Sequence, residues 1–371
     1  MNFDLSEEQQ VVADLSAQLF TDLAEPDRVK AVTESDDFDR NLWASLADAG
    51  MLGLTVPESA GGIGLGVVGL TLLAREQGRK VAPVPLVSTL LSAMTLAEHF
   101  GDVDGVSDIV AGVVGGETIV TSALAEYGVN DPLHPNTTAV AGPNGVTLNG
   151  DKPAVSTLMQ ADWVLVPAMR DATVVLALVD TSSVGVVREK VHTTNHEPAG
   201  NLQLDAVEVP SDRVIDVPGV LDELYHRHLV GLAALQVGAG EGSVTQAAAH
   251  VSEREQFGRA LSTFQAVSQR AADGYITNEG IWSTVINAAW QLDNQAADAV
   301  IDVLTAAWWA SEATPQVVQS SQHLHAGIGA DVDYPVHRQY LWGVQNASLL
   351  GSASSHLARL GRHLAAEPVH R

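Results

Sequence analysis

The chain has no cysteine among its 371 residues. This absence excludes a disulfide framework, a thiol nucleophile and a thiolate metal site. Long apolar runs are also missing, since none approaches the roughly 20 residues that cross a bilayer. The first residues form an acidic amphipathic pattern, not the basic and then apolar segments of a signal peptide. We therefore expect a cytoplasmic protein with no membrane segment.

Positive charge is scarce as well. Lysine and arginine together number 19 against 45 aspartates and glutamates, and the formal net charge at pH 7 is −26. Nucleic-acid binding needs cationic side chains that replace counterions, so this balance disfavours nucleic acid and anionic membrane surfaces as partners. A polyanionic ligand would need a local basic patch, because the overall field repels it.

Apolar residues are plentiful, and their spacing divides the chain into three regions. They make up 46% of the sequence, which is ample for sizeable cores. Residues 1–115 have helical spacing, residues 116–218 have short β-branched runs between turn signals, and residues 219–371 are helical again. We predict an α+β multidomain fold with an N-terminal α-helical domain, a middle β domain and a C-terminal helical bundle over these ranges.

Individual signals support this division. Ser6 and Gln9 form a capping-box pattern at the first helix. Gly142-Pro-Asn-Gly145 is a turn signal between two short strands. Leu229–Val237 is apolar on all sides, as in a helix buried within a bundle. A second long helical run is predicted over Asn287–Trp309.

The segment Arg254-Glu-Gln-Phe257-Gly258, followed by Phe264-Gln265, combines groups that suit a nucleotide. Arg254 can make forked, charge-assisted hydrogen bonds to phosphate oxygens. Phe257 can pack on a flat ring, and Gln265 can both donate to and accept from a base. A helix end with an exposed arginine and a core phenylalanine explains the same residues. The local sequence leaves both interpretations open.

A second segment lies about sixty residues further on. It reads His323-Leu-His325-Ala326-Gly327-Ile-Gly329, and its small residues allow the backbone to come close to a ligand. Asp333-Tyr-Pro335 follows it. This pair of segments, in this order and at this separation, resembles the C-terminal domain of acyl-CoA dehydrogenases.

Earlier segments strengthen the resemblance, which covers nearly the whole chain. Gly53-Leu-Thr-Val-Pro57-Glu58 with Gly61-Gly62-Ile-Gly64 is similar to a glycine-rich loop of that family, and Leu148-Asn149-Gly150-Asp-Lys152 is similar to one of its hairpins. The resemblance implies a helical domain, a β-barrel and a four-helix bundle. It also implies FAD as cofactor and an acyl-CoA thioester as substrate.

The resemblance further implies which residues contact FAD. In that family a set of C-terminal residues, here called the nucleotide arm, contacts the diphosphate and adenine of the FAD that the neighbouring subunit binds. Most of this arm is present here, as Arg254, Phe257, Gln265, His323, Ala326 and Gly327. Ser352 corresponds to a position near the FAD ribose and diphosphate. The flavin-ring site is altered, because the ring-covering tryptophan is Ala154 and a hydroxyl residue is Leu124, although Ser156 keeps its hydroxyl. The expected cofactor-binding residues are Arg254, Phe257, Gln265, His323, Ala326, Gly327, Ser352 and Ser156.

Both positions at which the family carries its catalytic carboxylate lack an acid here. The resemblance assigns one position to Leu350 and the other to His228, twenty-six residues before Arg254. Leucine cannot accept a proton, whereas histidine can act as a base near neutral pH. Glu241 is a further candidate, but it lies thirteen residues, between three and four helical turns, beyond His228. We expect no catalytic residue in this chain.

This combination resembles the partner subunit of heteromeric α2β2 acyl-CoA dehydrogenases of actinobacterial steroid side-chain degradation. The expected partners are a second acyl-CoA dehydrogenase-like chain with the catalytic glutamate, an acyl-CoA, and an electron-transfer flavoprotein as acceptor. No metal is expected, because no His/Asp/Glu set has ligand spacing. Two alternatives stay open. One is a self-sufficient dehydrogenase, oxidase or monooxygenase relative with His228 or Glu241 as base, and the other is a flavin-free structural or CoA-ester-binding protein.

Overall fold

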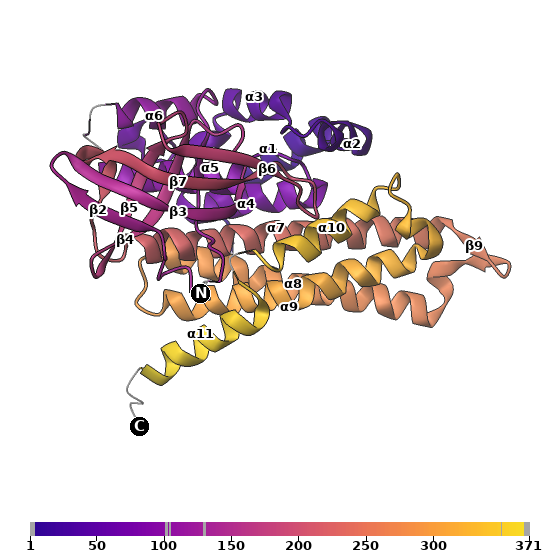
Figure 1. The fold of residues 1–371 in the computed structure, drawn as a ribbon. Coiled ribbons are helices and arrows are strands. Elements are labelled where there is room, and N and C mark those ends of the chain that lie inside the picture. Colours follow the sequence, from indigo (N-terminus) through magenta and orange to yellow (C-terminus); the bar gives the residue numbers. More distant parts are fainter. Residues whose placement is uncertain (1–3, 101–102, 104, 129–130, 350, 367–371) are drawn as a thin grey trace. The chain divides into compact units, whose positions relative to one another are not determined.

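The computed structural model describes residues 4–100, 103, 105–128, 131–349 and 351–366 (Figure 1). The chain divides into two compact units. The sheet unit comprises residues 30–70 and 83–228, and the helical unit comprises residues 1–29, 71–82 and 229–371. Of the helices in the described ranges, none is long and apolar enough to cross a membrane.

The sheet unit is built on eight strands in the order β6-β7-β3-β2-β4-β5-β8, with β1 parallel to β4 at the side of this path. The predicted turn at Gly142–Gly145 is confirmed as the link between β2 and β3. The strands are β1 (Val120–Ser122), β2 (Thr138–Gly142), β3 (Gly145–Ser156), β4 (Trp163–Arg170), β5 (Thr173–Asp180), β6 (Val186–Val191), β7 (Ala199–Pro210) and β8 (Val214–Ile215).

Alternating side chains of the sheet form a single core. Leu148 on β3, Ala177 on β5 and Leu204 on β7 belong to one buried cluster. Because β5 and β7 are separated by three strands in the sheet order and still contact each other, the sheet curls around this core. Among the described strands, the edge strands β6 and β8 are not paired with each other, so the expected barrel is an open, curled sheet.

Helices occupy most of the N-terminal region, as the apolar spacing predicts. The capping box at Ser6 is confirmed, with both of its hydrogen bonds present at the start of α1. Helix α5 is almost wholly buried, and it packs on α6 and β1. The helices are α1 (Glu7–Leu23), α2 (Pro26–Glu34), α3 (Arg40–Asp48), α4 (Gly66–Lys80), α5 (Leu86–Phe100) and α6 (Val106–Val114).

The C-terminal region contains the longest helices, and Figure 1 shows α8 and α9 side by side. Leu229–Val237 lies within α7, and all but one of its residues are buried, as predicted. The helices are α7 (Val220–Glu253), α8 (Gln265–Asp293), α9 (Ala299–Leu324), α10 (Val336–Asn346) and α11 (Ala353–Ala366). A two-stranded hairpin, β9 (Glu255–Gln256) and β10 (Arg259–Ala260), follows α7.

The prediction of one helix over Asn287–Trp309 is wrong. The helix α8 ends at Asp293, and α9 begins at Ala299. The polar residues between them form a turn in which Gln295 has a positive φ of 50°. The two apolar arms fold back on each other, so helical spacing on both sides of a polar turn looks continuous in the sequence.

Helices α4 and α7 meet backbone to backbone through glycines. A Cβ at Gly238 would lie 2.0 Å from the Arg75 carbonyl oxygen, and a Cβ at Gly242 would lie 2.3 Å from that of Arg79. On α4, a Cβ at Gly78 would lie 2.1 Å from the Leu235 carbonyl oxygen. Any side chain at these glycines would push the two helices apart, so the contact depends on glycine from both sides.

Candidate functional site

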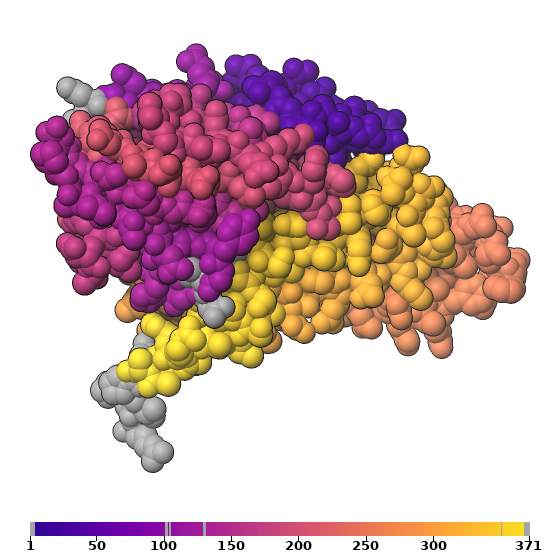
Figure 2. Space-filling view, viewed as in Figure 1, coloured from indigo at the N-terminus to yellow at the C-terminus, as the bar shows by residue number. Residues whose placement is uncertain are grey.

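The segment from Arg254 to Gly258 forms the tip of the β9–β10 hairpin. Phe257 and Gly258 occupy its two-residue turn with φ values of 55° and 77°, which is the left-handed geometry of a type I′ turn. The Phe257 side chain is 92% exposed and meets the ring of Phe264 edge-on at 6.2 Å between centroids. Figure 2 shows this region at the surface. Phe257 is therefore not a core residue, which removes one of the two interpretations left open by the sequence.

The other segments of the expected nucleotide arm come to the same end of the helices. A small apolar cluster joins Val251 near the end of α7, Val267 near the start of α8 and Leu324 at the end of α9. Around it, Gln265 begins α8, and His323 lies just before the short 3-10 helix η5 (Ala326–Ala330). All six arm residues are exposed: Arg254, Phe257, Gln265, His323, Ala326 and Gly327.

The chemistry of this arm fits the nucleotide part of FAD. Within the described residues, the Arg254 guanidinium has no ion pair. Gly327 has open space where a side chain would be, and Ala326 has a left-handed φ of 53°. An unpaired guanidinium, an exposed ring and an uncovered small-residue turn suit a diphosphate and a base that approach from outside the chain.

A buried histidine supports this turn, and the sequence reasoning did not find it. His325 is 2% exposed, its Nδ1 lies 2.8 Å from the Ser321 carbonyl oxygen, and its ring stacks on His250 at 4.6 Å between centroids. Tyr334 closes the cluster at 5.3 Å from His325. Burial lowers the pKa of His325, which favours the neutral ring. The sequence gives no signal for this contact, because the partner of His325 is the backbone carbonyl of Ser321, which any residue there would supply.

Ser352 lies at the start of α11. Its backbone N–H donates to Ser355 Oγ at 2.8 Å, and its exposed hydroxyl lies 3.0 Å from Ser354 Oγ. The structure therefore gives Ser352 a local role at a helix start, and its assignment to FAD stays a prediction. Leu350, one of the two base positions, lies outside the described residues.

The expected flavin-ring residues belong to the sheet unit. Ser156 ends β3 with an exposed side chain, and its carbonyl accepts from Thr121 Oγ1 at 2.8 Å. Ala154 lies in an irregular stretch of β3 with a φ of 48°, and its N–H donates to Asn201 Oδ1. Leu124 is buried at 4% exposure. A hydroxyl is thus available, whereas neither Ala154 nor Leu124 can stack on the ring or donate to it from a side chain.

Lys152, from one of the segments that carried the resemblance, forms a buried ion pair with Glu126. Lys152 Nζ lies 2.6 Å from Glu126 Oε1, and the two side chains are 0% and 4% exposed. Lys152 also donates to the Pro167 carbonyl oxygen at 3.0 Å, and Thr137 Oγ1 donates to Glu126 at 2.6 Å. Burial lowers the pKa of Lys152 to about 8. Burial alone would raise the pKa of Glu126, but the charge and hydrogen bond of Lys152, together with hydrogen bonds from Thr137 and the Asn136 backbone, lower that pKa overall.

His228 is buried in α7. It is 5% exposed, and its Nδ1 lies 2.8 Å from the Leu224 carbonyl oxygen. Its Nε2 is buried and has no hydrogen-bond partner among the described residues. Burial lowers the pKa of His228 to about 4, so the ring is neutral at pH 7.

Glu241, the other candidate base, forms an ion pair. Its Oε2 lies 2.8 Å from Arg75 Nε, and the Arg75 guanidinium lies over the Trp282 ring at 4.4 Å from the centroid. The carboxylate thus links α7 to α4 in the helical unit. This arrangement favours a structural role for Glu241.

Replacing His228 by glutamine should make the stability of the chain less sensitive to acid. Between pH 6.5 and 5.5 the His228 imidazole of the unfolded chain becomes protonated, whereas the buried ring of the folded chain, with its pKa of about 4, stays neutral. Stability therefore falls with pH in this range, and linkage gives a loss of about 1 kcal/mol from this residue. Urea unfolding at the two pH values, followed by tryptophan fluorescence, measures the difference. Equal pH dependence in the variant and the wild type would contradict the prediction.

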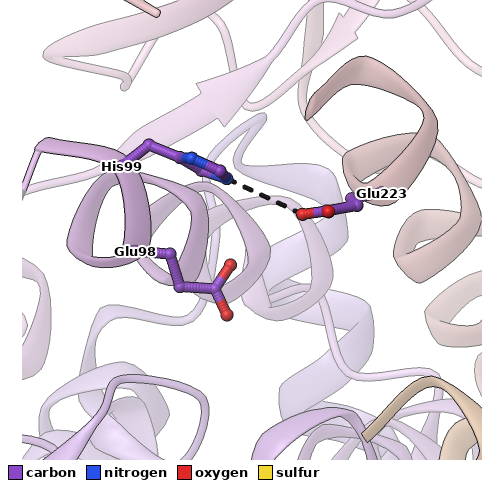
Figure 3. Close-up of side chains that lie close together, drawn as sticks. All are labelled: Glu98, His99 and Glu223. Atoms are coloured by element: carbon purple, nitrogen blue, oxygen red, sulfur yellow. Dashed lines mark ion pairs between the residues drawn. The ribbon is translucent and has the colours of Figure 1, made fainter. Parts of the chain in front are cut away.

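One side-chain group in the sheet unit brings together possible metal ligands (Figure 3). Glu98, His99 and Glu223 each offer a ligand atom, and these atoms lie within 4.8 Å of one another. His99 Nε2 is 3.7 Å from Glu223 Oε2. However, Arg227 donates to both oxygens of Glu98, at 2.6 and 3.1 Å. A divalent cation would lie beside this guanidinium, so the group forms an ion-pair network between α5 and α7, and we predict no metal there.

Comparison with known proteins places this geometry in context. The sequence matches the model of the acyl-CoA dehydrogenase N-terminal domain over residues 6–128 and that of the C-terminal domain over residues 225–365. It is 33% identical to the acyl-CoA dehydrogenase FadE27 of Mycobacterium tuberculosis over the full length of both chains.

Two solved structures are similar over nearly the whole chain. One is a variant of the Tcur3481-Tcur3483 steroid ACAD, with 42% identity and a TM-score of 0.92 over 97% of this chain and 98% of that chain. The other is the ChsE4-ChsE5 complex from Mycobacterium tuberculosis, with 32% identity and a TM-score of 0.92 over 100% of both chains. The order of helical, sheet and helical regions confirms the predicted fold class, and the expected cofactor, FAD, is that of the matched family. The chain belongs to the acyl-CoA dehydrogenase family.

Proposed function

We propose that this chain is one subunit of a heteromeric, FAD-dependent acyl-CoA dehydrogenase. In this assembly it contacts the FAD nucleotide, and a partner chain supplies the catalytic glutamate. The complex desaturates an acyl-CoA thioester between its α and β carbons. The observation that carries the proposal is the exposed, unpaired arm around Arg254 and Phe257, in a chain with no carboxylate at either base position of the family.

The arm is suited to a cofactor held mainly by another subunit. The guanidinium of Arg254 would neutralise the diphosphate, and the 92% exposed ring of Phe257 would lose its contact with water on assembly. When bound, FAD accepts the hydride that leaves the β carbon. This chain would contribute the hydroxyl of Ser156 on the ring side and no aromatic cover.

The candidate bases of the chain have other environments. His228 is buried and neutral, with its free Nε2 enclosed by protein. Glu241 is held by Arg75. A general base must come within hydrogen-bond reach of the proton that it removes, whereas the His228 ring is enclosed and the Glu241 carboxylate is engaged by a guanidinium. The glutamate is therefore assigned to the partner.

The similar proteins guide the choice of partner and substrate. Their titles name a steroid ACAD and a complex of two chains, ChsE4 and ChsE5. By analogy, the partner is a second acyl-CoA dehydrogenase-like chain with the catalytic glutamate, and the substrate is a steroid side-chain CoA ester. An electron-transfer flavoprotein is the proposed acceptor of the electrons.

Co-expression with such a partner tests the proposal. Alone, the chain should hold little FAD and should not reduce it with any acyl-CoA. Together, the two chains should purify as one yellow complex with one flavin per pair of chains, and flavin bleaching by acyl-CoA should depend on the partner's glutamate. Stoichiometric FAD with turnover in the lone chain would overturn the proposal in favour of a self-sufficient enzyme that uses His228 or Glu241. A chain that is colourless with every partner would favour a flavin-free protein.

Replacing Arg254 by alanine should weaken FAD binding to the complex by about 10- to 150-fold. The substitution removes a charge-assisted hydrogen bond to phosphate, which contributes roughly 1.5–3 kcal/mol. Absorbance of the bound flavin during FAD titration measures the change. Arg362→Ala, which removes an exposed arginine on α11, is the matched control and should bind FAD as the wild type does. Equal flavin content in both variants would remove Arg254 from the site.

A further inference from the structure

The β9–β10 hairpin carries a second arginine besides Arg254. Arg259 is exposed and lies directly opposite Gln256 in the hairpin register. The Leu261 N–H donates to the Arg254 carbonyl oxygen at 2.9 Å, so the ladder continues beyond the two strands. Because cross-strand partners share a face and side chains alternate along each strand, Arg254 and Arg259 lie on the same face of the hairpin. Such diagonal neighbours are about 7–8 Å apart, which is within reach of long side chains.

An aromatic ring holds the Arg259 side chain in place. Its guanidinium carbon lies 4.0 Å from the centroid of the Phe264 ring. A guanidinium that stacks on an aromatic face keeps its N–H donors, because they point outward in its own plane. In the part of the chain that the structure describes, the Arg259 side chain makes no ion pair and no hydrogen bond. Its donors are therefore oriented in advance and available to an anion.

The same ring joins Arg259 to the nucleotide arm. Phe264 meets Phe257 edge-on at 6.2 Å between centroids, and it directly precedes Gln265, the first residue of α8. Figure 1 shows the hairpin projecting past the end of α7. The second arginine thus lies beside residues that we assign to FAD, on a part of the helical unit that a ligand can approach from outside.

The charge of this segment is opposite to that of the chain. Residues 254–270 contain three arginines and a single acid, Glu255, whereas acidic residues outnumber lysine and arginine 45 to 19 in the whole sequence. Strand alternation places Glu255 on the face of the hairpin opposite to Arg254 and Arg259. The segment therefore supplies the local basic patch that a polyanionic ligand needs against the overall field.

We propose that Arg259 is a second ligand of the FAD diphosphate, so that Arg254 and Arg259 each bind one of its two phosphate groups. This inference rests on the proposed function, because it requires FAD to lie against the hairpin. A diphosphate carries negative charge on two adjacent groups, which matches two cations on one face. Since the stack on Phe264 already restricts Arg259, less conformational entropy is lost when the anion binds.

Titration of the flavin-free assembled complex with FAD tests this assignment. Arg259→Gln keeps a planar group that can lie on Phe264 but removes the charge, so it should weaken FAD binding about tenfold or more. Arg259→Lys keeps the charge, so its affinity should lie between those of the wild type and Arg259→Gln. Added KCl should weaken binding less in Arg259→Gln than in the wild type, because one fewer charged contact is screened. A residue that only supports the fold would not change this salt dependence.

Chemical protection tests the same contact without any substitution. In the flavin-free complex, phenylglyoxal should modify Arg259, and mass spectrometry measures the extent of reaction. FAD and ADP should both protect this arginine, whereas adenosine, which has no phosphate, should not. Equal protection by adenosine, or no protection by FAD, would overturn the phosphate contact.

The matching variant of the first arginine separates this inference from the proposed function. Weak FAD binding in Arg254→Ala together with wild-type binding in Arg259→Gln would overturn the role of Arg259 alone. Wild-type binding in both variants would overturn the contact between the hairpin and FAD. Equal weakening by Arg259→Lys and Arg259→Gln would show that Arg259 supports the Phe264 ring and does not bind phosphate. Arg362→Gln, which removes an exposed arginine of α11, is the control and should bind FAD as the wild type does.

Discussion

Replacing Lys152 by methionine should lower the free energy of unfolding by about 3–5 kcal/mol, because breaking a buried ion pair from one side leaves the other charge without compensation. Glu126 would keep its hydrogen bonds from Thr137 but would lose the only cation within 4 Å in the described part of the chain. Methionine has a similar volume, so the loss reports charge and not a cavity. Urea unfolding of the purified chain, followed by the fluorescence of its tryptophans, measures the change.

The matched control is Lys190→Met, since Lys190 pairs with Asp36 at the surface of the same unit, with side chains 42% and 51% exposed. Exposed pairs contribute little because water screens their charges, so this variant should remain near the wild type. The double variant Glu126→Gln with Lys152→Met should recover much of the lost stability, because it removes both charges. Equal small losses in Lys152→Met and Lys190→Met would show that the buried pair is not a stabilising element.

Replacing Gly238 by alanine should destabilise the helical unit by about 3 kcal/mol or more, at or above the upper end of the usual cost of overpacking. The added Cβ would lie 2.0 Å from the Arg75 carbonyl oxygen and 2.6 Å from the Arg79 nitrogen. Both atoms are backbone, so no side chain can move away, and α4 must shift from α7. Thermal unfolding monitored by circular dichroism measures the result.

A glycine in open space provides the control for this substitution. Gly361 lies in α11, and no atom lies within 4 Å of the position of its Cβ. Alanine there should stabilise the helix by up to about 1 kcal/mol, because glycine is a poorer helix former. Opposite signs for the same chemical change would confirm the packing argument, and a stabilising Gly238→Ala would refute it.

The residues of the proposed nucleotide arm could be selected from the sequence because their pattern is local. Arg254, Phe257 and Gly258 lie within five residues, and the hairpin turn has positive φ at Phe257 and Gly258. The order of helical and strand regions was predictable for the same reason, since periodicity is read in short windows. The division between α8 and α9 was not, because both arms share one helical spacing and only a short polar turn separates them.

The remaining site features depend on contacts between distant segments. Lys152 was identified as part of a hairpin motif, but its ion pair with Glu126 arises only when β3 places Lys152 within the sheet core. The ion pair of Glu241 with Arg75 likewise joins residues that are far apart in the sequence, and it forms because α4 packs against α7.

The hairpin tip has a consequence for the life of the protein in the cell. Phe257 combines a left-handed backbone, which is unfavourable for a bulky residue, with a ring that is 92% exposed. In the heteromeric assembly proposed above, a copy without its partner would leave this ring in water. We expect such copies to aggregate more readily than the assembled complex.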